Sequence, residues 1–132
     1  MATIRRFENI QAWQKARELV RKIYKVSACG AFKQDYGLRE QTRRAAVSAM
    51  SNIAEGFARK TSRDFAHFLD VAKGSAVEVE SLLYVALDTG YIRADEFQEL
   101  YRTAEEVISL IGGFTSYLRG AGGRTAQLRT PN

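Results

Sequence analysis

The single proline of this 132-residue chain is residue 131, so no proline interrupts a helix along the body of the chain. Apolar residues instead recur at spacings of three and four through four consecutive stretches, about 9–28, 36–58, 61–88 and 94–118. No stretch of useful length alternates between apolar and polar residues as a strand would. The sequence therefore predicts an all-α chain folded as an up-down-up-down antiparallel four-helix bundle.

The length of the chain allows one domain and leaves no room for a second. We expect residues 1–8 to form an N-terminal extension and residues 9–118 to form the bundle domain. Residues 119–132 are rich in glycine and contain three arginines, which predicts a disordered tail.

Residues that favour helix ends fall between the predicted helices. Gly30 and Gly90 suit the ends of the first and third helices. Asp35 can cap the start of the second helix. Thr61 and Asp64 have the spacing of a capping box, in which a hydroxyl precedes an acidic residue by three positions. These signals predict short links between long helices.

The net charge of +5 hides an uneven distribution along the chain. Residues 1–60 hold 13 Lys and Arg against 5 Asp and Glu, whereas residues 61–118 hold 4 against 10. A basic half and an acidic half favour docking on each other, within a subunit or between subunits. A nucleic-acid partner for the basic half is the alternative.

The cysteine content and the hydropathy of the chain bear on its location. The single cysteine, Cys29, cannot form an internal disulfide, which fits a reducing cytoplasm. No apolar stretch approaches the roughly 20 residues that span a bilayer. We therefore expect a cytoplasmic protein with no membrane partner.

The run from residue 41 to residue 56 is helical in composition but unusually rich in both polar and very small residues. Its polar positions share one helix face, and the third predicted helix carries a matching set of polar residues at helical spacing. We expect a partly buried structural network of Arg44, Asn52, Glu55 and Glu78, with Arg44 packed and its neighbour Arg43 more exposed. Because a buried charge persists only when it is paired, Arg44→Ala is expected to weaken assembly. The alternative is a set of independent solvated side chains.

Five basic residues could contact a nucleic acid: Arg39, Arg43, Arg59, Lys60 and Arg63. The first two are four residues apart and share a helix face, and the other three cluster at one end of the bundle. In an oligomer each patch is repeated, which strengthens weak phosphate contacts. The aromatic residues fall mostly at core spacing, so we expect no stacking platform and no sequence-specific recognition.

The sequence argues against an enzyme. A di-iron bundle needs two Glu-x-x-His motifs, and the chain has one histidine, His67. A helical ribonuclease of the arginine-histidine type would need four to six residues between the pair, whereas three lie between Arg63 and His67 and seven between Arg59 and His67. No glycine-rich phosphate loop follows a strand. We expect no catalytic residue, metal, cofactor or small-molecule substrate.

Several motifs occur in an order that resembles one protein family. They are Trp-Gln-Lys-Ala at 13–16, Tyr-Gly-Leu at 36–38, the run 41–56, Ala-Lys-Gly-Ser at 72–75 and Gly-Tyr-Ile at 90–92. Over about residues 7–118 the chain resembles the bacterial four-helix bundle proteins encoded by intervening sequences of 23S ribosomal RNA genes.

The resemblance implies a left-handed up-down bundle that assembles as a homopentamer and has no established catalytic activity. A related branch, the accessory proteins of diversity-generating retroelements, forms basic pentamers that bind nucleic acid and a reverse transcriptase. By analogy, an RNA- or nucleoprotein-binding scaffold is the alternative function. Met50 stands where the family typically places proline, so we expect the second helix to run straighter here.

Overall fold

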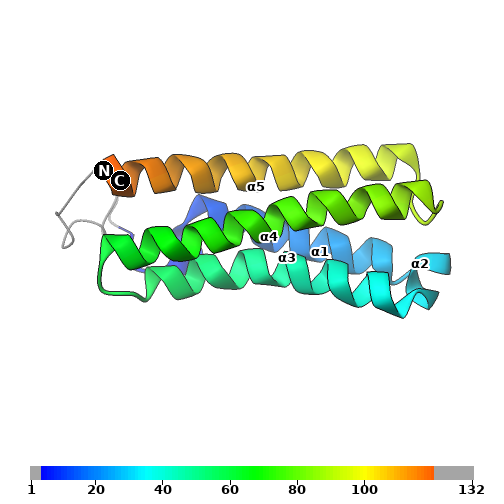
Figure 1. The fold of residues 1–132 in the computed structure, drawn as a ribbon, viewed down its shortest axis with the longest axis horizontal. Helices are drawn as coiled ribbons and strands as arrows, with labels where there is room; N and C mark the ends of the chain where they lie inside the picture. The colour runs from blue at the N-terminus through cyan, green and yellow to red at the C-terminus, as the bar shows by residue number, and fades with distance from the viewer. Residues whose placement is uncertain (1–3, 121–132) are drawn as a thin grey trace.

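The computed structural model describes residues 4–120, all of whose regular structure is helical. The elements are η1 (Phe7–Asn9), α1 (Gln11–Ser27), α2 (Gly30–Gln34), α3 (Tyr36–Phe57), α4 (Ser62–Asp88) and α5 (Ala94–Gly120). The long helices α1, α3, α4 and α5 lie side by side (Figure 1). The all-helical prediction is confirmed, whereas the short helices η1 and α2 were not predicted. The helix α5 includes residues 119 and 120, so the predicted tail begins too early, and residues 121–132 lie outside the described part of the chain.

The predicted caps hold the starts of α3 and α4. The Asp35 carboxylate accepts a hydrogen bond from the Leu38 backbone N–H at 3.0 Å, and the Thr61 hydroxyl accepts one from the Asp64 backbone N–H at 3.1 Å. Each bond satisfies a backbone donor that the first helical turn leaves unpaired. Gly90 follows α4 with a φ of +79°, a conformation that favours glycine. Helix α3 is continuous through Met50.

The unpredicted helix α2 closes one end of the bundle. Its Phe32 is completely buried and stacks on Tyr91, from the link between α4 and α5, with 5.6 Å between the ring centroids. The Tyr91 hydroxyl donates a hydrogen bond of 2.9 Å to the Asp35 carboxylate. Two links that are far apart in the sequence are therefore fastened together.

Small residues bring α3 and α4 close together. Ala45, Ala46, Ala49 and Gly56 are buried on α3. A Cβ atom added at Gly56 would lie only 2.8 Å from Cβ of Phe68 and 2.9 Å from Cδ1 of Phe65. Close contact between the two helices therefore explains the small residue at position 56.

Ion pairs join the basic α1 to the acidic α5 inside one chain. The Lys22 ammonium lies 2.5 Å from the Glu99 carboxylate and 2.9 Å from the Thr103 hydroxyl. The Lys15 ammonium lies 3.6 Å from the Glu106 carboxylate. Part of the charge complementarity predicted from the sequence is thus used within the subunit.

Candidate interaction surfaces

A polar seam runs between α3 and α4. The Ser48 and Ser75 hydroxyls are hydrogen-bonded at 2.8 Å, and the Asn52 amide donates to the Ser48 carbonyl at 2.9 Å. The Gln41 amide donates to the Glu78 carboxylate at 3.4 Å. The bonds of Ser48 with Ser75 and of Gln41 with Glu78 join the two helices, and the Asn52 bond lies within α3 beside them. The seam therefore fixes how α3 is aligned against α4.

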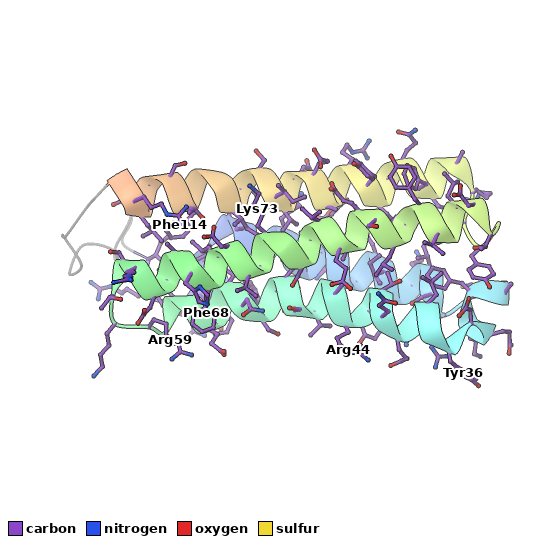
Figure 2. All side chains as sticks on the ribbon, in the orientation of Figure 1. Tyr36, Arg44, Arg59, Phe68, Lys73 and Phe114 are labelled. Atoms are coloured by element: carbon purple, nitrogen blue, oxygen red, sulfur yellow. The ribbon has the colours of Figure 1, made fainter. Side chains whose placement is uncertain are left out.

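The predicted network is not brought together within one chain. Arg44 is exposed and forms no hydrogen bond or ion pair with any of residues 4–120, and it projects away from the bundle (Figure 2). Glu55 is also exposed and faces Arg59 at 3.9 Å. Only Asn52 and Glu78 take part in the seam, each with a partner outside the predicted set. Arg44 lies on the outward face of α3, because the turn of the helix carries it away from the face on which Gln41 and Ser48 reach α4.

The same outward side of α3 and α4 carries large apolar side chains. Those exposed there are Val47, Val71, Val77 and Val85. Gly74 is exposed among them, and nothing in the described chain lies within 4 Å of where its Cβ would be. We call this side, with Arg44, the α3/α4 face. These exposed valines fall outside the apolar positions that the sequence assigned to the core of the bundle.

The arginine assignments at 43 and 44 were reversed. Arg43 is the packed residue: its Nε donates to the Ser27 hydroxyl at 2.8 Å, and its guanidinium lies 4.4 Å from the centroid of the Tyr24 ring. Arg39 lies 4.5 Å from the centroid of the Tyr36 ring. These tyrosines are 43% and 66% exposed. Two aromatic rings therefore reach the surface beside the basic residues, although most aromatic residues fall at core spacing.

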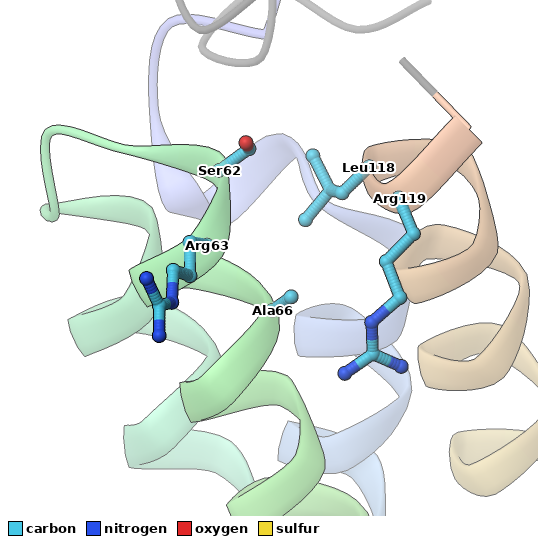
Figure 3. Close-up of a pocket in the computed structure, with 5 residues that line it drawn as sticks. All are labelled: Ser62, Arg63, Ala66, Leu118 and Arg119. Atoms are coloured by element: carbon cyan, nitrogen blue, oxygen red, sulfur yellow. The ribbon is translucent and has the colours of Figure 1, made fainter. Parts of the chain in front are cut away.

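The other predicted basic cluster lies where α3 meets α4. Arg59 covers the Phe68 ring at 4.4 Å (Figure 2), while Lys60 and Arg63 are exposed. A hollow of about 250 Å³ opens nearby, lined by Ser62, Arg63, Ala66, Leu118 and Arg119 (Figure 3). Arg119 is already paired with Asp70 at 2.7 Å. Among the described residues that line the hollow, Ser62 carries the only hydroxyl and Arg63 and Arg119 are the charged side chains.

A pair of carboxyl groups lies between α4 and α5. Glu80 is only 8% exposed, and its Oε2 has no hydrogen-bond partner among residues 4–120. Burial, the neighbouring Glu105 carboxyl and its charge raise the pKa of Glu80 to about 8. The charge of Glu80 in turn raises the pKa of Tyr101. Sequence reasoning missed this site, because Glu80 reads as one more solvated acid in an acidic helix.

The described residues contain no group of three or more His, Cys, Asp or Glu side chains placed to hold a metal ion. His67 is exposed and has its ring edge-on to Phe68, with 5.6 Å between the centroids. Within residues 4–120 no helix has both the length and the apolar character needed to cross a bilayer.

Comparison with known proteins gives a family and a fold. A sequence model of the family described as 23S rRNA-intervening sequence protein matches residues 8–113. The chain is similar to the solved structure of a protein of unknown function from the S23 ribosomal protein family of Bacteroides thetaiotaomicron, with a TM-score of 0.72 and 22% identity. That similarity covers 79% of this chain and 97% of the other. No curated protein matches the chain.

Proposed function

The chain belongs to the 23S rRNA-intervening sequence protein family, and we propose that it acts without catalysis, as an up-down four-helix subunit of a homopentamer. The observation that carries this proposal is the α3/α4 face, where exposed valines surround the open backbone of Gly74. Exposed apolar residues grouped on one face mark interaction sites, and a glycine among them lets a second helix approach closely.

The charge distribution favours a ring over a two-fold dimer. Residues 1–60 carry a net charge of +8 and residues 61–118 a net charge of −6, so the subunit has a basic α1/α3 side and an acidic α4/α5 side. A two-fold interface places the same patch on both subunits and would oppose like charges across much of its area. A head-to-tail interface joins opposite charges and closes into a ring.

A tryptophan at Gly74 tests the assembly. Gly74→Trp is expected to leave the subunit folded, since its Cβ meets no atom within 4 Å, and to weaken assembly more than 100-fold by blocking helix approach. Native mass spectrometry and sedimentation at micromolar concentration measure the outcome, with the wild type expected at five subunits. Gly113→Trp, at a glycine of α5 that is equally open, is the matched control and should assemble. A monomeric wild type, or an assembled Gly74→Trp variant, would contradict the proposal.

A second function, binding of single-stranded RNA, is favoured by the arginine-tyrosine pairs of α1 and α3. Tyr24 with Arg43 and Tyr36 with Arg39 each present an exposed ring beside a guanidinium. Aromatic rings stack on unpaired bases, and arginines neutralise the adjoining phosphates. Repetition in an oligomer multiplies these contacts.

If RNA binds at these pairs, its affinity should depend on the salt concentration and on Arg39 and Arg43. Replacing Arg39 and Arg43 with alanine should weaken binding of a single-stranded oligonucleotide at least 10-fold and flatten its salt dependence. Replacing Arg93 and Arg102 of the acidic half removes the same charge and should change little. Fluorescence anisotropy at several salt concentrations gives both quantities. If the two double variants lose the same affinity for the oligonucleotide, binding depends only on net charge and the proposed site is rejected.

A further inference from the structure

The buried carboxyl of Glu80 lacks a counter-charge inside its own chain. It is 8% exposed, and Oε2 meets no donor among residues 4–120. Burial and the neighbouring Glu105 carboxyl raise the pKa of Glu80 to about 8, so the ionised form of Glu80 is disfavoured in the isolated subunit. A buried oxygen with no donor is costly, which suggests that a cation completes the site.

The surroundings of Glu80 suit a flat organic cation. Tyr84 of α4 lies beside Phe97 and Tyr101 of α5, with ring centroids 4.9 and 5.9 Å away. Tyr84 is half exposed, so this aromatic cluster reaches the surface next to the carboxyl pair. Aromatic rings together with carboxylates bind guanidinium groups by cation-π contact and paired hydrogen bonds.

A candidate for this cation is an arginine of a second copy that has no ion pair within the described part of its own chain. Arg44 projects from α3 with no hydrogen bond or ion pair to any of residues 4–120. The contacts of Gln41 with Glu78 and of Ser48 with Ser75 place residue 44 level with about residues 75–78 of α4. Glu80 lies only two to five residues farther along α4, an axial offset of roughly 3–8 Å. Arg44 and Glu80 therefore stand at similar heights on different sides of the bundle.

We propose that the Glu80 and Glu105 carboxyl pair, with Tyr84 and Tyr101, is the receptor for Arg44 of a neighbouring copy of this chain. The inference rests on the proposed ring assembly and names the contact that would set its register. In a ring whose axis runs along the helices, residues at similar heights on two different faces meet. The guanidinium then takes the place of the proton, donating N–H bonds to Glu80 and Glu105.

The exchange of a proton for a guanidinium makes assembly depend on pH. The groups that face Glu80 are Tyr84 on its own helix and Tyr101 and Glu105 on α5. Docking of Arg44 favours the ionised form of Glu80, so each contact releases one proton. The dissociation constant of a single contact should fall up to tenfold for each pH unit between about 6 and 8. Glu80→Gln, which has no proton to release, should assemble more weakly and without this dependence.

Charge reversal tests the contact directly. Arg44→Glu and Glu105→Arg are each expected to weaken assembly at least 100-fold, because each puts like charges face to face. The double variant should recover assembly, since the pair is restored with reversed signs. Arg5→Glu changes an exposed arginine outside the four long helices by the same charge and should assemble as the wild type does. Sedimentation at pH 6 and pH 8 measures assembly, and circular dichroism confirms that each variant is folded.

The outcomes separate this inference from the assembly on which it rests. Recovery in the double variant, with a loss of pH dependence in Glu80→Gln, supports the contact. An assembled wild type whose assembly ignores Arg44→Glu overturns the contact and leaves the pentamer intact. Two disrupted single variants with no recovery in the double variant also overturn it. A wild type that stays monomeric overturns both proposals.

Discussion

Replacing Gly56 with alanine is expected to lower the free energy of unfolding by about 2 kcal/mol. The added methyl group would lie 2.8 Å from Cβ of Phe68 and 2.9 Å from a ring carbon of Phe65. Cβ of Phe68 is fixed to the α4 backbone, so a rotamer change cannot relieve the contact. The two helices must move apart, which loosens the packing of a side chain, Phe65, that is 1% exposed. Urea unfolding followed by circular dichroism measures the difference.

Gly112→Ala is the matched control for this change. Gly112 also lies inside a long helix, but nothing in the described chain is within 4 Å of its Cβ position. Alanine there should raise the free energy of unfolding by up to about 1 kcal/mol, because glycine is the poorer helix former. If Gly56→Ala were stabilising to the same extent, α3 and α4 could not be as close as the structure places them.

Replacing Glu80 with glutamine is expected to stabilise the unassembled subunit at alkaline pH by about 2 kcal/mol. The folded chain holds Glu80 at a pKa of about 8, above its ordinary value of 4.5. The folded state therefore binds a proton that the unfolded state has lost between these two values. By linkage, the contribution of Glu80 to stability is fully present below about pH 4.5, declines as pH rises and is lost above about pH 8. Glutamine removes the ionisation and with it this decline.

The measurement needs subunits that do not associate, because assembly is expected to respond to pH with the opposite sign. Unfolding of the Gly74→Trp variant, with and without Glu80→Gln, at pH 5, 7 and 9 provides this condition. Glu78→Gln, on the exposed side of the same helix, is the control and should leave the pH profile unchanged. Parallel profiles with and without the Glu80→Gln substitution would show that the carboxyl is better solvated than the structure indicates.

The long helices could be predicted from the sequence because each has its own evidence. The 3.6-residue period continues over 17 to 27 residues in every one of them, and polar caps such as Asp35 and Thr61 mark where helices begin. Helix α2 has five residues, too few for a period to be visible, so the buried position of Phe32 depends on its contact with Tyr91.

The interaction surfaces were harder to predict, because periodicity assigns residues to faces but does not say which neighbour each face meets. Arg43 and Arg44 are about 100° apart on a helix, and a small rotation decides which of them packs against α1. Glu80 stands beside Val79 and Leu83 in the sequence, and only the tertiary fold shows that α5 covers it. Position on a helix was thus predictable, whereas partner and burial were not.

The fastening of Asp35 to Tyr91 has a consequence for how the chain folds during synthesis. The hydrogen bond spans 56 positions, and the ring that covers Phe32 belongs to the same distant link. Helices α3 and α4 can pair through nearby contacts as soon as both have been made, but Phe32 gains its cover only after residue 91 is available. Until then the growing polypeptide displays an uncovered aromatic side chain, which is a site for chaperone binding or premature association. Closure of this end of the bundle therefore waits for the link before α5, after α1, α2, α3 and α4 have been made.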